Sequence, residues 1–456
     1  MARSNVYINR RNFLKGTTAA MALSSFGAYG IDLMYSPRPI RVGLIGTGWY
    51  GKSDLFRLIQ VAHVEVVSLC DPDGHMLAEA AEMVKLRQKS GNTPRRYTDY
   101  RKMLAEKDLD LVLIGSPDHW HALHGIEAMK SGAHLYLQKP ISVDVMEGEA
   151  LLAAANTYGK IAQIGTQRRS TPHLIDAKKH VVDAGLLGKV SHVGICCYYH
   201  MRDKGNRRAE AIPEFFDYDL WTGPAPLREF DGLPHRRWRA FMEYGNGIVG
   251  DMCVHMLDTV RWMLDLGWPK KVSSTGGIFV QKEAKANISD TQTAVFEFDE
   301  LNCIWNHRTW GNPVDPEYPW AFKIYGERGT LAGSVKKADF IPRGDGKPLH
   351  FDVLYEREKY PGDLVEKGME LHAAPATRLH MLDLLSAIDS GQKPVADMGN
   401  GHISTASCIL ANLSMDLGRP LTYDPKTRTI PNDTQATALL QRTYREGWEH
   451  PLPEMF

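Results

Sequence analysis

The sequence has no excess of charge of either sign and no apolar run long enough to cross a membrane. Its 456 residues include 54 lysines and arginines and 54 aspartates and glutamates. A chain with balanced charge has no electrostatic basis for binding nucleic acid or an anionic membrane surface. A transmembrane helix needs about 20 predominantly apolar residues in succession. We therefore expect no nucleic-acid partner and no stable insertion into a membrane.

Cysteine is also scarce. Six cysteines are scattered through the chain, and the one adjacent pair, Cys196 and Cys197, lacks the CxxC spacing of a metal site. A disulfide framework is not expected in a chain of this size. Hydrophobic content of 43% and charged content of 24% are typical of a globular protein. The length predicts two or more domains, and no internal repeat is visible.

The N-terminal stretch NRRNFLKGTTAAMALSSFGAYG differs in kind from the rest of the chain. It pairs Arg10 with Arg11 and continues into a short, mildly apolar run that is rich in small residues. The motif RRNFLK resembles a twin-arginine export signal, and the alternative is a basic tail ahead of an amphipathic helix. We expect residues 1–36 to be a signal and linker and the protein to be periplasmic. The twin-arginine route carries folded proteins.

Strand and helix patterns alternate between residues 38 and 164. IRVGLIG, VEVVSLC, DLVLIGS and AHLYLQ are apolar runs, and segments with helical spacing follow them. This alternation predicts a doubly wound parallel sheet. From 165 to 456 the pattern changes to longer strands, such as VSHVGICC and DTQTAVFEFD, with helices near the C-terminus. We expect a second domain there, built on a mainly antiparallel sheet.

A glycine-rich turn lies between the first strand and the first helix of this alternating region. In GTGWYG, Gly46, Gly48 and Gly51 allow a tight turn and a close approach of backbone N–H groups to a pyrophosphate. Asp71 stands twenty residues after Gly51, at the end of the second strand. A carboxylate there accepts hydrogen bonds from ribose hydroxyls and repels a 2′-phosphate. The pattern predicts NAD rather than NADP as the cofactor; the alternative is a tight turn followed by a helix-capping aspartate.

Four further motifs, SPDHWH, LQKP, IGTQRRSTP and GDMCVHMLD, occur in this order along the chain. With the glycine-rich turn, they resemble the Gfo/Idh/MocA family of sugar and polyol oxidoreductases over nearly everything after the signal. The resemblance implies a Rossmann domain, then an α/β domain whose open sheet often forms contacts in a homodimer or homotetramer. It also implies a carbohydrate substrate. The main departure is Gln138, which stands where the family has Glu and so lacks its charge.

The resemblance also assigns roles to residues. Lys139 and His255 flank the carbinol carbon: His255 removes the hydroxyl proton, for which a pKa near neutrality is suited, and Lys139 stabilises the alkoxide. The residues implied in cofactor binding are Gly46, Gly48, Trp49, Tyr50, Gly51, Asp71, Ser116, His121, Gln138 and Lys139. Those implied in substrate binding are Arg169, Asp251 and His255.

GDMCVHMLD places Asp251, His255 and Asp258 at i, i+4 and i+7, so on a helix they share one face. Asp251 is expected to orient the His255 imidazole or to bind a sugar hydroxyl, and alternatively it is only a helix N-cap. Asp258 alternatively pairs with Arg261 at the surface. No metal is expected, because on a helix Cys253 projects about 160° away from His255. Four tryptophans either stack on sugar faces or belong to the core: Trp238, Trp305, Trp310 and Trp320.

Two functions follow from these features, and they differ in net chemistry. The first is NAD-dependent oxidation of a ring hydroxyl of a sugar or glycoside, for instance at C3 to give a 3-keto-sugar, or the reverse. An exported enzyme has no free NAD pool, so the cofactor is expected to be tightly bound. The second is a glycoside hydrolase or lyase that uses NAD transiently, by oxidation, elimination and re-reduction. A non-catalytic sugar sensor is a third alternative, against which Lys139 and His255 argue.

Overall fold

The computed structural model describes residues 38–198, 205–232 and 237–456. The predicted export signal, residues 1–36, lies outside the described residues. Within them, no helix is both long enough and apolar enough to span a membrane.

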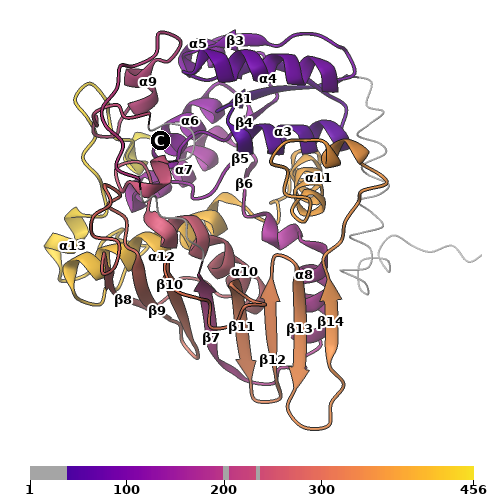
Figure 1. Cartoon of the computed structure of the whole chain (residues 1–456), viewed down its shortest axis with the longest axis vertical. Coiled ribbons are helices and arrows are strands. Elements are labelled where there is room, and N and C mark those ends of the chain that lie inside the picture. Colours follow the sequence, from indigo (N-terminus) through magenta and orange to yellow (C-terminus); the bar gives the residue numbers. More distant parts are fainter. Residues whose placement is uncertain (1–37, 199–204, 233–236) are drawn as a thin grey trace, which may run out of the picture.

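The first domain is a parallel sheet of six strands covered by helices (Figure 1). The strands are β1 (Ile40–Ile45), β2 (Val64–Cys70), β3 (Arg95–Tyr97), β4 (Leu111–Ile114), β5 (His134–Leu137) and β6 (Ala162–Ile164). Their order in the sheet is β3-β2-β1-β4-β5-β6, in which the direction of winding reverses next to β1. The intervening helices are α3 (Trp49–Val61), α4 (Gly74–Arg87), α5 (Tyr100–Leu104), α6 (His121–Lys130) and α7 (Val145–Tyr158). In such sheets ligands bind beyond the carboxyl ends of the strands at this reversal.

The second domain is built on a sheet of eight strands at the opposite end of the molecule (Figure 1). Its strands are β7 (Val190–Cys197), β8 (Lys271–Gly277), β9 (Thr291–Glu297), β10 (Asn302–Arg308), β11 (Trp320–Gly326), β12 (Gly329–Ser334), β13 (Lys337–Pro342) and β14 (Leu349–Asp352). Their order is β14-β13-β12-β11-β7-β10-β9-β8, and among the strands of the described residues only β7 and β10 pair in parallel. Alternate residues of β9 are buried, as expected when helices cover one face of a sheet. The predicted fold class is confirmed.

Two helices of the second domain lie between the sheets (Figure 1). These are α10 (Val254–Leu264) and α12 (Met398–Leu417), and α12 packs on β8. The shorter helices are α8 (Pro172–Ala177), α9 (Tyr218–Thr222) and α13 (Thr434–Ala438). Apolar side chains of α10, α12 and the sheet form one continuous core.

The helix α11 (Ala374–Ser390) returns to the first domain (Figure 1). It packs beside α3, and its Met381, Leu384 and Leu385 belong to the core cluster of β1, β2 and β4. Sequence patterns predicted a second domain over the whole of 165–456. Within that range, α11 buries its apolar face against the Rossmann domain rather than against the second sheet.

Candidate active site

A cavity of about 760 Å³ lies where the two domains meet, at the carboxyl ends of the parallel strands. It is lined by most of the residues that the sequence implied in cofactor or substrate binding. Those are Gly46, Gly48, Trp49, Tyr50, Asp71, Ser116, His121, Gln138, Lys139, Asp251 and His255. Gly51 and Arg169 are not in the lining.

The glycine turn between β1 and α3 leaves its backbone open to this cavity. A β-carbon on Gly46, whose φ is +89°, would lie 2.4 Å from the Ser116 nitrogen, and one on Gly51 would lie 2.1 Å from the Gly46 oxygen. A β-carbon on Gly48 would meet only Met76, at 4.0 Å. No side chain caps the N-terminus of α3 at Gly48. Gly46 and Gly51 therefore close the turn, and Gly48 leaves room for a phosphate at the helix N-terminus.

Asp71 follows β2 and faces the same cavity. Its Oδ2 accepts the backbone N–H of Thr47 at 2.7 Å and the Thr47 hydroxyl at 3.0 Å, and its Oδ1 accepts the backbone N–H of Asp73 at 2.9 Å. Burial raises the pKa of Asp71, although these hydrogen bonds oppose the shift. A carboxylate has about four acceptor sites. The side chain therefore ties the glycine turn to β2 and keeps the capacity to accept a ribose hydroxyl, so the turn and Asp71 together fit a dinucleotide.

Two segments of the second domain contribute to the cavity wall, through Phe216 and Gly368. Gly74 N–H donates to the Phe215 carbonyl at 2.8 Å, and the His75 and Phe215 rings stack with centroids 3.6 Å apart. In addition, the Trp49 indole donates to the Gly368 carbonyl at 2.9 Å. These contacts join the N-termini of α3 and α4 in the first domain to segments of the second domain around Phe215 and Gly368. A dinucleotide in this cavity would be enclosed by both domains.

Lys139 and Asp251 form an ion pair across the domain boundary. The Lys139 Nζ donates to Asp251 Oδ1 at 2.5 Å and to its backbone oxygen at 3.0 Å, and Arg239 lies 3.6 Å from Oδ2. Burial alone would raise the pKa of Asp251, but the charges of Lys139 and Arg239 outweigh burial and lower it. Asp251 lies within a wide π-type turn, Val249–Cys253, whose N-cap is Ile248. The alternative that Asp251 is a helix N-cap is therefore wrong.

His255 is the second residue of α10, and its ring packs edge-on against Trp320 with centroids 5.6 Å apart. Its Nδ1 is buried and has no hydrogen-bond partner among the described residues, so Asp251 does not orient it. Burial lowers the pKa of His255 well below its ordinary value, and the charges of Lys139 and Arg168 act in the same direction. The expectation that His255 titrates near neutrality is thus not met. The imidazole is neutral, which is the form that accepts a hydrogen bond from a hydroxyl.

Arg169 and Asp258 correct two sequence predictions. The Arg169 guanidinium binds both oxygens of Asp258, at 2.7 and 2.8 Å, and neither side chain is exposed by more than 5%. Arg261 is also buried, with its Nη1 3.9 Å from Asp258. Asp258 therefore does not form a surface pair, and Arg169 is occupied by a structural carboxylate rather than available to substrate. Its neighbour Arg168 faces the cavity.

Gln138 and His121 lie where β4 and β5 end. The Gln138 amide donates to Asp54 at 2.6 Å, and its oxygen accepts the Lys139 backbone N–H at 3.2 Å. Burial raises the pKa of Asp54 to about 7. His121 has its Nδ1 2.6 Å from the Pro140 carbonyl oxygen, and burial lowers its pKa to about 4. Both side chains thus fix the segment that carries Lys139.

Several cavity residues were missed or left undecided by the sequence. They are Asp118, Arg168, Trp238, Arg239 and Trp320. Asp118 lies within SPDHWH, which was a usable signal. The other four come from segments whose spacing does not show which side chain turns inward. Of the four tryptophans weighed above, Trp238 and Trp320 line the cavity, whereas Trp305 is fully buried in the core and Trp310 bonds to Thr291.

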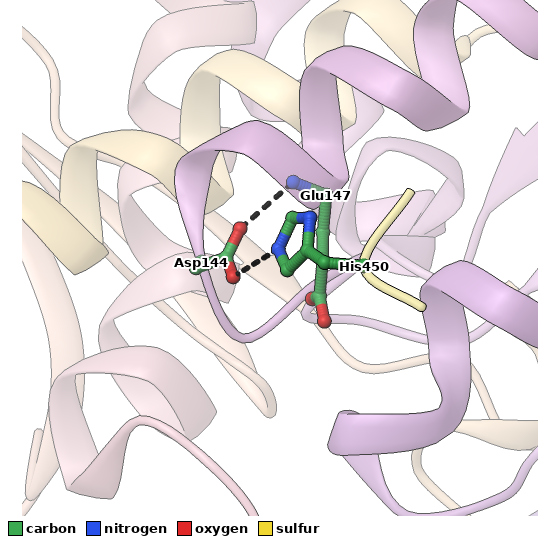
Figure 2. A group of neighbouring side chains, drawn as sticks. All are labelled: Asp144, Glu147 and His450. Atoms are coloured by element: carbon green, nitrogen blue, oxygen red, sulfur yellow. Dashed lines mark hydrogen bonds and ion pairs between the residues drawn. The ribbon is translucent and has the colours of Figure 1, made fainter. Parts of the chain in front are cut away.

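A buried group of two carboxylates and an imidazole lies outside the cavity, at the start of α7 (Figure 2). Asp144 accepts hydrogen bonds from Glu147 N–H at 2.8 Å, Arg442 N–H at 2.9 Å and His450 Nε2 at 2.7 Å. Glu147 accepts one from the Tyr444 hydroxyl. Protein donors already use these oxygens. The group therefore fastens the C-terminal segment to α7 and is not put forward as a metal site.

The chain is similar in sequence to known oxidoreductases. Residues 40–166 match the oxidoreductase family with an NAD-binding Rossmann fold, GFO_IDH_MocA, and residues 173–293 and 350–450 match the C-terminal alpha/beta domain of this family. The uncharacterized oxidoreductase YrbE of Bacillus subtilis is 24% identical over 342 residues, which cover 72% of this chain and 85% of YrbE. An alpha-N-acetylgalactosaminidase of Shewanella oneidensis is 27% identical over 220 residues, covering 42% of this chain and only 46% of that protein.

Solved structures share the fold. The aldose-aldose oxidoreductase of Caulobacter crescentus, complexed with glycerol, aligns with a TM-score of 0.62 and 16% identity over 84% of this chain and 100% of its own. The WlbA dehydrogenase of Bordetella pertussis, in complex with NADH and UDP-GlcNAcA, aligns with a TM-score of 0.61 and 19% identity over 85% and 99%. At these identities the likeness shows the architecture.

Proposed function

The chain belongs to the Gfo/Idh/MocA family of oxidoreductases, and we propose that it oxidises a ring hydroxyl of a sugar or glycoside with enclosed NAD. One observation carries this proposal: the Lys139–Asp251 ion pair and His255 share a single cavity with the glycine turn and Asp71. Bound NAD would supply the hydride acceptor. The aromatic walls formed by Trp238 and Trp320 suit the apolar faces of a sugar ring.

The protein's own part in this reaction is to bind and deprotonate the hydroxyl. Neutral His255 accepts the hydroxyl proton, and Lys139 donates a hydrogen bond to the oxygen as negative charge develops there. Asp251 holds the ammonium group of Lys139 in place. Segments of both domains line the cavity and limit the contact of bulk solvent with the reacting carbon. The same contacts support retention of the cofactor between turnovers.

The test is product analysis on the purified protein. It should carry NAD through purification, and a panel of sugars and glycosides should include one that reduces this cofactor, seen by the absorbance of reduced nicotinamide. Mass spectrometry should then detect the matching keto-sugar or a product derived from it. The proposal fails if no sugar or polyol in a broad panel reduces the bound cofactor.

A second function is supported by the relatives whose names state glycoside cleavage, such as the alpha-N-acetylgalactosaminidase above. In this alternative the oxidation is transient. The ketone acidifies the neighbouring C–H bond, the glycosidic substituent is eliminated, and re-reduction returns a plain sugar. The two functions share the cavity and the first step. They differ in products, because only net oxidation yields a keto-sugar or an aldonolactone.

We predict that Asp71→Ser shifts cofactor preference from NAD towards NADP. The change removes the carboxylate that would repel the 2′-phosphate, and the ratio of affinities should move by about 1–3 kcal/mol, the scale of hydrogen bonds to a charged group. Titration of the cofactor-free protein with each nucleotide measures the ratio. Asp73→Asn is the matched control, because its carboxylate caps α4 through His75 and Met76. Tighter binding of NADP by the unaltered protein would contradict the role given to Asp71.

We also propose export in the folded state, on the evidence of the RRNFLK motif alone. Replacement of Arg10 and Arg11 by lysine should leave folded, cofactor-loaded protein in the cytoplasm of a bacterium that has the twin-arginine machinery. Fractionation followed by measurement of bound NAD tests this. Unchanged periplasmic protein in the double variant would refute the proposal.

A further inference from the structure

Asp118 is a buried carboxyl of the cavity without a hydrogen-bond donor. It begins the short 3-10 turn Asp118–Trp120 after β4, and only 5% of it is exposed. No described residue donates a hydrogen bond to either carboxylate oxygen. The other aspartates of the site differ in this respect, since Asp71 accepts from Thr47 and Asp251 from Lys139. An unpaired buried carboxylate is costly, so the neutral acid is favoured here.

Burial favours the protonated form of Asp118, although cationic side chains lie nearby. Burial raises the pKa of Asp118 to about 8, although Arg239 and Lys139 oppose the shift and Asp251 supports it. Backbone lies next to one oxygen, because a β-carbon added to Gly245 would be 3.2 Å from Oδ2. The carboxyl faces the cavity that Lys139 and His255 also line. Asp118 and His255 are therefore two separate acid–base groups that face the same cavity.

We propose that Asp118 is a second acid–base group, which protonates the oxygen that leaves when a glycosidic bond is broken in this cavity. Oxidation of one hydroxyl needs a single proton acceptor, whereas cleavage of a C–O bond also needs a proton donor for the leaving oxygen. The inference rests on the proposed oxidation and on the second, redox-neutral function, because the bond becomes labile only after the neighbouring hydroxyl has been oxidised to a ketone. It names the substrate class as glycosides.

Protons and electrons balance over the whole cleavage reaction. After oxidation His255 passes the hydroxyl proton to solvent, and it then takes the proton from the carbon between the ketone and the glycosidic carbon. The electron pair of that C–H bond forms a C=C bond, the glycosidic C–O pair stays on the leaving oxygen, and the Asp118 proton joins that oxygen. Water then adds to the glycosidic carbon, giving its proton to the Asp118 carboxylate, while His255 returns its proton to carbon. Bound reduced NAD would supply the hydride that the ketone needs, and with a proton from solvent the net change is hydrolysis.

The experiment compares Asp118→Asn with the unaltered protein on methyl and 4-nitrophenyl glycosides of the sugar that reduces the bound cofactor. An alkoxide needs a proton to leave, and nitrophenolate does not. Cleavage of the methyl glycoside should fall by about 10²–10⁴-fold, the usual contribution of a general acid. The loss on the nitrophenyl glycoside should be at least about tenfold smaller, as should the loss in cofactor reduction. Asp416→Asn, which removes an exposed carboxyl outside this cavity, is the control.

A readout without substrate accompanies the kinetics. Infrared titration of the protein should show a carboxylic-acid band that disappears as the pH rises through about 8 and that is missing in Asp118→Asn. Equal losses on both glycosides, a band component titrating near pH 8 that persists in the variant, or an unaltered protein that releases only keto-sugar would each overturn the role of Asp118. Failure of every sugar to reduce the bound cofactor is a different result, and it would overturn the proposed oxidation together with this inference.

Discussion

Replacement of Lys139 by alanine is expected to lower kcat by about 10²–10³-fold, the range for a hydrogen-bond donor that stabilises negative charge developing on oxygen in the transition state. The ammonium group of Lys139 lies 2.5 Å from Asp251 Oδ1, so the change also leaves a buried carboxylate with only Arg239, at 3.6 Å, beside it. The pKa of Asp251 should rise in consequence. Substrate affinity should change less than kcat, because the main interaction develops with the alkoxide.

His255→Ala provides the comparison. It should also cost about 10²–10⁴-fold in kcat, with little change in NAD affinity, because the ring lies beside Trp320 on the substrate side. Because burial holds the pKa of His255 well below its ordinary value, the ring is neutral around neutrality. Its loss should therefore leave any ionisation near pH 8 in place, and that ionisation belongs to Asp118.

Steady-state and single-turnover rates over a range of pH measure both variants. Lys85→Ala, a lysine change on the exposed face of α4, is the control for expression and folding. A Lys139→Ala protein with kcat within tenfold of the unaltered protein would reduce Lys139 to a structural partner of Asp251. A metal requirement for activity would reopen the metal alternative that the position of Cys253 argued against.

The cofactor half of the site could be predicted from the sequence because its signal is local. The glycine turn, the helix behind it and Asp71 form one strand–turn–helix–strand unit, so spacing along the chain translates directly into position. Asp251 and His255 were recognisable for the same reason, since one short stretch places both on one side of a helix. Asp251 lies inside the wide turn Val249–Cys253 rather than at a helix N-cap, and it still lines the cavity.

The substrate half was less predictable because its geometry depends on distant contacts. Arg168 and Arg169 are adjacent, and the sequence favoured Arg169. The short turn Gln167–Ser170 directs the Arg168 guanidinium into the cavity and the Arg169 guanidinium onto α10. Which of the two arginines turns away from the cavity depends on the position of Asp258, which is distant in the sequence. The apolar residues of α11 likewise indicate that the helix is buried, but they do not indicate which domain it packs against.

Loss of the Asp258 carboxylate is the prediction with the largest expected effect on stability. Asp258 is fully buried, it binds Arg169 through two hydrogen bonds, and it accepts a third from the Ser404 hydroxyl at 2.8 Å. Burial alone would raise its pKa, but the charge of Arg169 outweighs burial and lowers it. Asp258→Ala would leave two buried arginines, Arg169 and Arg261, without this counter-charge. The free energy of unfolding should fall by about 3–5 kcal/mol.

The pH dependence of this contribution has a definite sign. A carboxyl whose pKa is lowered in the folded state stabilises the fold above its unfolded pKa, about 4, and loses that effect as the pH falls through its folded value. Chemical denaturation at neutral and acidic pH should thus show the unaltered protein and Asp258→Ala converging in acid.

The matched double variant, Arg169→Met with Asp258→Leu, should lose less stability than the sum of the two single changes, because neither charge is then left unpaired by the other. Strict additivity would show that the two side chains do not interact. A selective rise in KM for Arg169→Met, without loss of stability, would instead return Arg169 to the substrate-binding role that its sequence motif first implied.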